Sequence, residues 1–114
     1  MNEPLQIPEV DPTEAARLID TGQVLLLDVR EDDEWDSGHA PQASHVPLGA
    51  LDPAAIPRDR PVIAVCRSGA RAGKAAQALG QTGHDVHNLT GGMQAWAQAG
   101  LPVHGADGTP GIVT

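Results

Sequence analysis

The sequence predicts an α/β fold in which a parallel sheet lies between helices on both faces. Continuous apolar runs at Val24–Leu27 and Val62–Val65 are typical of strands that are buried on both sides. Segments with helical periodicity lie between the predicted strands, and this alternation favours a three-layer α/β/α arrangement. The chain has 114 residues, which is the length of one ordinary domain.

The first elements are predicted from short-range signals. A short edge strand is expected at Leu5–Ile7, ended by the proline that follows it. In the next segment Asp11 can cap a helix, Pro12 suits its first position, and Glu14 can reach back to complete a capping box. Gly22 is expected to end this helix.

The middle of the chain contains shorter elements. An acidic helix is expected within residues 31–37 with Trp35 as its anchor, followed by a very short strand at residues 44–46. Arg30 and Glu34 are four residues apart, and we expect them to pair. Residues 48–51 are long enough for one helical turn.

The second half contains the clearest helix. Residues 70–81 carry alanines and a leucine on one side, which permits close packing on a sheet. A strand at residues 86–89 and a helix at residues 93–99 complete the alternation. The Gly/Pro-rich end is expected to be a loose tail. We therefore expect one domain over residues 5–103 and a tail over residues 104–114.

The loop between the strand 62–65 and the helix 70–81 contains Cys66, the only cysteine of the chain. Unpaired N–H groups and the helix dipole make a helix N-terminus a place that binds anions. A helix N-terminus or a neighbouring cation also favours the thiolate form of cysteine, which is the nucleophile. Arg67, Arg71 and Lys74 lie close by in a chain of net charge −8. These residues predict a cationic pocket around a reactive sulfur.

Composition excludes several classes of function. A net charge of −8 argues against nucleic acid or an anionic membrane as a partner. One cysteine excludes an internal disulfide and fits a reducing compartment, and no signal peptide or membrane span is apparent, so we expect a cytoplasmic protein. The five histidines have no spacing typical of a metal site, and we expect none.

Three motifs then resemble those of the rhodanese-like sulfurtransferases. Residues 66–71, Cys-Arg-Ser-Gly-Ala-Arg, resemble the active-site loop of that family. Upstream, Leu27–Arg30, Glu34-Trp35 and Gly38–Pro41 resemble its L-D-V-R…E-[FWY]…G-H-x-P-G-A signature, from which the chain departs at Gln42, where the family usually has glycine. Downstream, Leu89–Trp96 resembles its L-x-G-G-x-x-x-W ending. The resemblance extends over about residues 5–103.

The resemblance implies a fold, a reaction and a set of site residues. It implies a five-stranded parallel sheet of order 3-2-4-5-1, with the Asp28 strand beside the Cys66 strand. Cys66 would carry sulfur as a persulfide, taken from a small anionic donor such as thiosulfate. The acceptor would be cyanide, a thiol or a sulfur-accepting protein, and neither a metal nor an organic cofactor is implied. The residues expected to bind the substrate are Arg67, Ser68, Gly69, Ala70 and Arg71. Asp28 and Arg30 would either support this loop or form a structural turn.

Three further interpretations remain open at this point. One is an inert structural domain, which would have a thiol that alkylates slowly. The related phosphatases and arsenate reductases use a C-x5-R loop, whereas residues 66–71 form the shorter C-x4-R, which suits a persulfide better than a phosphocysteine. A sulfur-carrier or regulatory module would need the same reactive Cys66 without rapid turnover. Arg67 stands where related mercaptopyruvate enzymes generally carry glycine, which favours thiosulfate over 3-mercaptopyruvate as donor.

Overall fold

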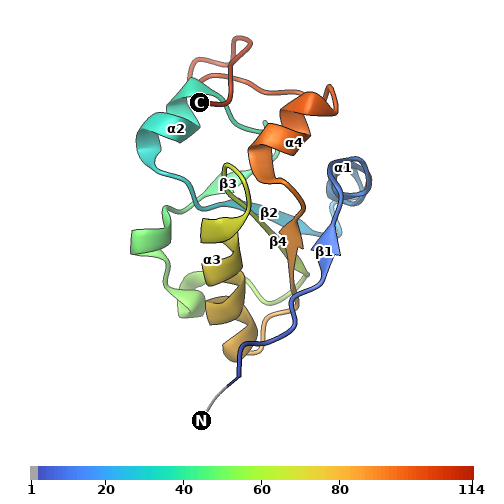
Figure 1. The fold of residues 1–114 in the computed structure, drawn as a ribbon, viewed down its shortest axis with the longest axis vertical. Helices are drawn as coiled ribbons and strands as arrows, with labels where there is room; N and C mark the ends of the chain where they lie inside the picture. Colours follow the sequence, from blue (N-terminus) through green and yellow to red (C-terminus); the bar gives the residue numbers. More distant parts are fainter. Residues whose placement is uncertain (1–2) are drawn as a thin grey trace.

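The computed structural model describes residues 3–114, in which five strands form one parallel sheet (Figure 1). The strands are β1 (Glu9–Val10), β2 (Leu25–Asp28), β3 (Ser44–His45), β4 (Val62–Val65) and β5 (Val86–Leu89). Read from one edge, their order is β3-β2-β4-β5-β1. The predicted α/β class and the strand order implied by the family resemblance are both confirmed.

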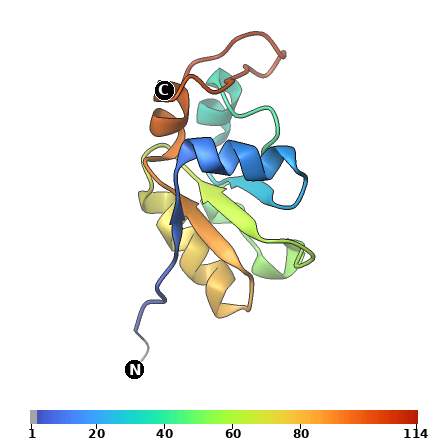
Figure 2. The same cartoon turned by 90° about the vertical axis from the view of Figure 1, so that its right-hand side faces the viewer.

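Helices cover both faces of this sheet (Figures 1 and 2). The helices are α1 (Pro12–Asp20), α2 (Asp32–Ser37), α3 (Ala70–Gln81) and α4 (Gly92–Gln98), with 3₁₀ turns at Leu48–Ala50 and Pro53–Ala55. The side chains of α3 pack in one core with Leu27 and Ala64 of the sheet. Those of α1 and α4 pack in a second core with Leu26 and Ile63. Successive residues of β2 and β4 therefore supply opposite cores, as strands buried on both faces must.

The edge strand β1 lies later in the chain than predicted. We expected it at residues 5–7, but the pairing with β5 begins at Glu9, opposite Asn88. Pro8 has no N–H to donate, yet its carbonyl accepts a hydrogen bond from the Asn88 N–H at 2.9 Å. Leu5 instead exchanges backbone hydrogen bonds with the side chain of Gln77. The other predicted strands and helices are present, with ends that differ by a residue or two.

Helix α1 begins as predicted, with one correction to its cap. Asp11 accepts a hydrogen bond from the Glu14 N–H at 2.8 Å, and Pro12 is the first helical residue. Glu14 does not reach back to close a capping box, because its carboxylate pairs with Arg17 one turn further along. Gly22 follows the helix with a φ of +76°, as expected for a residue that ends it.

Residues 104–114 are not the loose tail that their composition predicts. The His104 backbone exchanges two hydrogen bonds with His39, and the Ile112 N–H donates to Ser37 at 2.9 Å. This packing needs glycine on both sides, because a Cβ on Gly38 would lie 2.3 Å from the Ile112 oxygen and one on Gly111 would lie 2.6 Å from the Ser37 oxygen. The segment therefore folds back along the end of α2. No helix within residues 3–114 combines the length and apolar character that crossing a membrane requires.

Candidate active site

Cys66 lies directly after β4, where the chain turns from the sheet into α3. Strand β4 pairs with β2 so that Val65 lies opposite Asp28, and the two strands therefore end side by side. Cys66 is buried, with 1% of the residue exposed. Its Sγ accepts a hydrogen bond from the Gly69 backbone N–H at 3.0 Å. The loop that follows β4 thus folds back over its own sulfur.

Gly69 allows this loop conformation. Its φ of +125° and ψ of −20° lie in a region that residues with side chains rarely adopt. Gly69 is also the N-cap of α3, and its carbonyl accepts the Gly73 N–H at 2.9 Å. The first N–H groups of an α-helix have no partner within the helix, and they favour negative charge. The loop thus combines a buried sulfur with a backbone suited to an anion.

Helix α4 packs its N-terminus against the other side of the loop. The Met93 N–H donates to the Cys66 carbonyl at 2.7 Å, and the Gln94 N–H donates to the Arg67 carbonyl at 3.0 Å. A Cβ on Gly92 would lie 2.5 Å from both of these carbonyl oxygens. Gly92 therefore belongs to the site as its closest backbone neighbour. The sequence placed Gly92 only in the family's ending motif, as part of the turn into the last helix, although a double glycine just before a helix also signals a close backbone approach.

Arg71, which ends the motif of residues 66–71 and lies in the first turn of α3, is held by Glu34 of α2. Its two terminal nitrogens donate to the two carboxylate oxygens of Glu34, at 2.5 and 2.9 Å. This hydrogen bonding holds the pKa of Glu34 at about 2, below its ordinary value of 4.5. The same contact raises the pKa of Arg71 above its ordinary value. The sequence placed Arg71 at the site but missed Glu34, although the resemblance included it.

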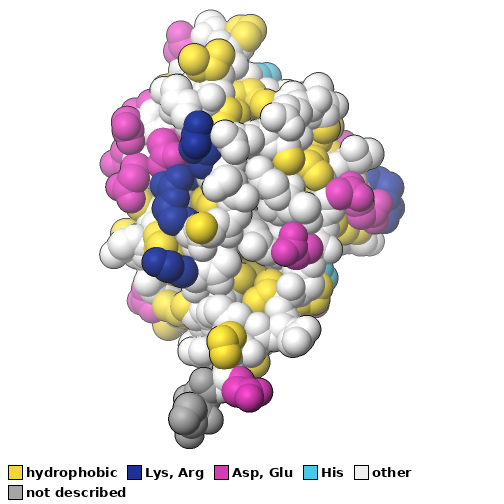
Figure 3. All heavy atoms as spheres, viewed as in Figure 1, with side chains coloured by type: hydrophobic (Ala, Val, Ile, Leu, Met, Phe, Trp, Pro, Cys, Tyr) yellow, Lys and Arg dark blue, Asp and Glu magenta, His cyan; other side chains and the backbone are white. Residues whose placement is uncertain are grey.

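Arg67, Ser68 and Ala70 are exposed on the outside of the loop. Arg67 Nε donates to the Thr114 carbonyl at 2.9 Å, the one hydrogen bond of this side chain among residues 3–114. Figure 3 shows the Lys and Arg side chains gathered over α3 and the loop before it, beside the acidic side chains over α2. Of the predicted cations, Arg71 pairs with Glu34, whereas no Asp or Glu carboxylate within the described residues pairs with the exposed Arg67.

Asp28 and Arg30 form a buried ion pair at the end of β2. Arg30 Nη2 lies 2.8 Å from Asp28 Oδ2, and both side chains are fully buried. The predicted pairing of Arg30 with the Glu34 carboxylate is wrong, because Arg30 pairs with Asp28 and that carboxylate pairs with Arg71. Arg30 reaches only the Glu34 backbone carbonyl, at 3.4 Å. Arg30 also donates to the backbone carbonyl of Gly38 at 2.8 Å. The pair thus anchors the far end of the helix that carries Glu34.

Trp35 anchors α2 in a way that the sequence did not indicate. Its ring stacks on that of His39 at 3.6 Å and on that of His45 at 4.7 Å, measured between ring centroids. These histidines therefore serve the packing of α2. Within residues 3–114 no group of three His, Cys, Asp or Glu side chains is placed to hold a metal ion.

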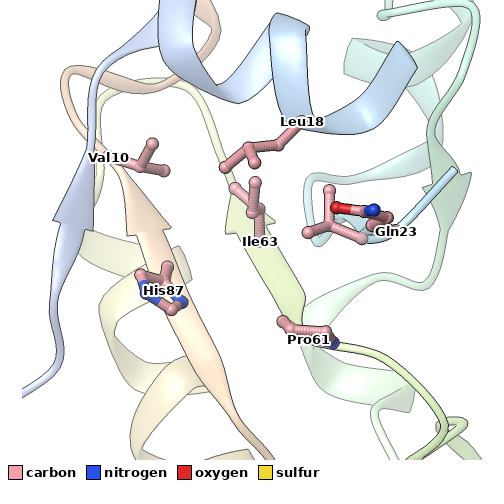
Figure 4. Close-up of a pocket in the computed structure, with 7 residues that line it drawn as sticks. Val10, Leu18, Gln23, Pro61, Ile63 and His87 are labelled. Carbon is pink, nitrogen blue, oxygen red and sulfur yellow. The ribbon is translucent and has the colours of Figure 1, made fainter. Parts of the chain in front are cut away.

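A cavity of about 290 Å³ lies elsewhere in the molecule (Figure 4). It opens on the face of the sheet that α1 partly covers, with His87 of β5 at one side and Ile63 of β4 at its floor. Its remaining walls are Val10, Leu18, Gln23, Val24 and Pro61. No residue of the loop 66–71 lines it, so it is separate from the site at Cys66.

Comparison with known proteins assigns the family. Residues 11–99 match the Rhodanese-like domain family, and the chain belongs to that family. A protein of Allochromatium vinosum named "Sulfurtransferase" is 43% identical over 95 residues, which cover 81% of this chain and 89% of that protein.

Two other matches are a solved structure with the same fold and a longer protein of which this chain matches only a part. The crystal structure of a rhodanese-related protein from Thermoplasma volcanium superposes with a TM-score of 0.79 and 26% identity, covering 84% of this chain and 96% of that one. An HTH-type transcriptional regulator, Rv0324 of Mycobacterium tuberculosis, is 36% identical over 94 residues. The match covers 79% of this chain and 42% of the regulator.

Proposed function

We propose that this chain is a sulfurtransferase that takes a sulfane sulfur from thiosulfate onto Cys66 and passes it to a thiophilic acceptor. In the first step the Cys66 thiolate attacks the outer sulfur of thiosulfate. A new S–S bond to Cys66 forms, the S–S bond of thiosulfate breaks, and sulfite leaves with the electron pair. The enzyme then carries a persulfide anion, which is the covalent intermediate of a ping-pong reaction.

In the second step an acceptor removes the outer sulfur. Cyanide or a thiolate attacks that sulfur, the bond to Cys66 breaks, and the electron pair returns to Sγ as thiolate. The products are thiocyanate or a new persulfide, so the acceptor can be a small molecule or a protein thiol. The reaction needs no metal and no organic cofactor. A reducing compartment such as the cytoplasm would keep the lone Cys66 available as a thiol.

The hydrogen bond from the Gly69 N–H to Cys66 Sγ is the observation that carries this proposal. This hydrogen bond directs a backbone donor at Cys66 Sγ. That atom bears the negative charge before sulfur is loaded from thiosulfate, and again after the hand-off, in which the outer sulfur passes to the acceptor. Fixed donors aimed at developing charge are an effective form of stabilisation, because they need no reorganisation during the reaction. Membership of the rhodanese-like family, with a relative named "Sulfurtransferase", supports the same reaction.

The size of the loop argues against a phosphatase or an arsenate reductase. Cys66 and Arg71 enclose four residues, and Arg71 is already bound by both oxygens of Glu34. A phosphoryl group would need a wider ring and a free arginine for its three outer oxygens. We expect no saturable hydrolysis of aryl phosphates by the purified protein.

A sulfur-carrier or regulatory module is the second candidate. The similarity to an HTH-type transcriptional regulator favours it, because there a rhodanese-like segment is joined to a protein with another task. Such a module would load sulfur onto Cys66 once and pass it on only to a specific protein. Steady-state thiocyanate formation from thiosulfate and cyanide would favour the enzyme, whereas loading without turnover would favour the module.

The direct test is intact mass after thiosulfate treatment. Loading should add one sulfur, about 32 Da, to the wild-type chain, and cyanide should remove it with formation of thiocyanate. Cys66→Ser should gain nothing under the same conditions, while Ser44→Ala, a change to an exposed serine of β3 outside the loop, should load normally. A wild-type protein that gains no mass from thiosulfate would contradict the proposed donor, and a serine variant that gains it would contradict the proposed residue.

A further inference from the structure

Asn88 is a polar residue on the sheet directly beneath the active-site loop. It lies on β5, where Val86 on the same side packs into the core beneath α3. Its amide nitrogen lies 3.8 Å from the position that a Cβ on Gly73 would take, so the side chain faces the first turns of α3. Asn88 Nδ2 donates to the Gly69 carbonyl at 3.3 Å. One side chain thus connects the sheet to the residue whose N–H holds the sulfur.

Gly69 needs an external contact of this kind. Glycine has no side chain and ranges widely in φ and ψ, so its own conformational preference does not fix the direction of its N–H. The Gly69 carbonyl is held by the Gly73 N–H of α3 and by Asn88 of the sheet. The Gly69 carbonyl and the N–H that points at Cys66 Sγ lie in neighbouring peptide planes that meet at the Gly69 Cα. Fixing the carbonyl plane therefore narrows the range of φ and ψ through which the N–H can turn away from the sulfur.

An asparagine at position 88 is not explained by a contribution to the stability of the fold. Its Oδ1 is buried and has no hydrogen-bond partner among the described residues. A buried polar atom without a partner destabilises the folded state, and asparagine is also depleted in strands. A β-branched apolar residue would fill this strand position without either penalty. The orientation of the amide is fixed all the same, because a flipped amide would place Oδ1 against the Gly69 carbonyl oxygen.

We propose that Asn88 is a positioning residue for sulfur transfer, which holds Gly69 so that its N–H points at Cys66 Sγ. This inference rests on the proposed function. The effect should be largest in the hand-off step, because there the breaking S–S bond returns the electron pair to Sγ. One fixed donor at a developing charge is worth about 10²–10³ in rate, and a displaced donor should lose part of this, about tenfold.

Asn88→Val and His87→Val form a matched pair for the test. Both replace a polar residue of β5 by valine, but His87 faces the opposite side of the sheet and the cavity of Figure 4. Each protein is loaded with thiosulfate, freed of excess donor and mixed with cyanide, and thiocyanate formation is followed in a single turnover. We expect hand-off to slow about tenfold in Asn88→Val and to stay unchanged in His87→Val. The melting temperature of Asn88→Val should not fall.

Equal hand-off rates in wild type and Asn88→Val would overturn the inference, as would a lower melting temperature with unchanged hand-off. If wild type does not load sulfur at all, the proposed function fails, and the rate at which iodoacetamide alkylates Cys66 in the native protein decides the role of Asn88. A slower alkylation in Asn88→Val, with no change in His87→Val, supports positioning. The same rate in all three proteins overturns it.

Discussion

Glu34 accepts hydrogen bonds from both terminal nitrogens of Arg71, at 2.5 and 2.9 Å, and so ties the end of the active-site loop to α2. The same carboxylate accepts the Glu31 N–H at 3.0 Å and thereby caps its own helix. Any movement of α2 is therefore transmitted to the loop. Arg71 thus connects the start of α3 to α2, and the negative charge of Glu34 largely compensates its positive charge.

Glu34→Gln should lower stability in a way that depends on pH. The pKa of Glu34 is lowered from 4.5 to about 2 in the folded protein, so the folded state favours the ionised form. This stabilisation is fully present above the unfolded pKa and is lost as pH falls through the folded one. We expect wild type to exceed Glu34→Gln by about 1–2 kcal/mol at neutral pH, a modest value because Arg71 is partly exposed.

Urea unfolding of both proteins across a pH series measures this difference. The gap should be constant at neutral and weakly acidic pH and should shrink between about pH 4.5 and pH 2. Glu14→Gln is the matched control, because it removes a Glu–Arg pair that is exposed on α1. A gap for Glu34→Gln that grew on acidification would show that the ion pair does not stabilise the fold.

Arg30→Met should be more damaging than any surface change. It would leave Asp28 as a buried carboxylate without its partner, which typically costs about 3–5 kcal/mol. It would also release the Gly38 carbonyl that Arg30 holds at the end of α2. The double variant Asp28→Asn, Arg30→Met should recover part of the loss, because no unpaired charge remains. The free energies of unfolding of Asp28→Asn, Arg30→Met and the double variant are compared with that of wild type. If the loss in the double variant equals the sum of the losses in the two single variants, the two side chains are not directly coupled.

Gly92→Ala should destabilise the loop through a direct clash. The new Cβ would lie 2.5 Å from the carbonyl oxygens of Cys66 and Arg67, and φ at this position is +63°. We expect a loss of about 3 kcal/mol or more in the free energy of unfolding. Gly100→Ala separates the two causes, because Gly100 also has a positive φ of +78° but nothing lies within 4 Å of an added Cβ. Gly100→Ala should lower the free energy of unfolding by about 1 kcal/mol. Equal losses in Gly92→Ala and Gly100→Ala would rule out the clash as the cause.

Short-range patterns predicted much of this structure. The helix at residues 70–81 and the strands at residues 62–65 and 86–89 lie where they were expected, because an apolar run or a small-residue face decides each of them locally. The loop at Cys66 follows from the same strand–helix junction. The strand order came from the family resemblance, since nothing local in the sequence specifies which strands pair.

Relationships between distant segments could not be predicted in the same way. Glu34 and Arg71 are 37 positions apart in the sequence. They meet because α2 follows β2 and α3 follows β4, so that both helices start at the carboxyl ends of neighbouring parallel strands. The pairing of Arg30 with Glu34 was predicted from their spacing alone, whereas Arg30 pairs with Asp28 and the Glu34 carboxylate pairs with Arg71. Composition alone suggested a loose tail, but glycine at Gly38 and Gly111 permits close backbone packing that composition does not reveal.

Arg67→Gly tests how the loop selects its donor. The sequence suggested that Arg67 binds thiosulfate directly, but the side chain is exposed and its Nε donates to the Thr114 carbonyl. An exposed charge acts on a doubly charged anion mainly by steering it, and salt screens this effect. We now expect Arg67→Gly to lower kcat/KM for thiosulfate about threefold to tenfold at low ionic strength, with 3-mercaptopyruvate affected less because it carries one negative charge.

Arg58→Gly is the matched control for this measurement. Arg58 is also exposed and also donates to a backbone carbonyl, that of Thr82, but it precedes β4 whereas Arg67 follows it. Both variants change the net charge equally, so a larger loss in Arg67→Gly isolates the position of the charge. Measuring both donors at low and high ionic strength then separates steering from direct binding. A thiosulfate loss that persists at high salt would restore direct binding by Arg67, because a buried contact is screened far less than an exposed charge.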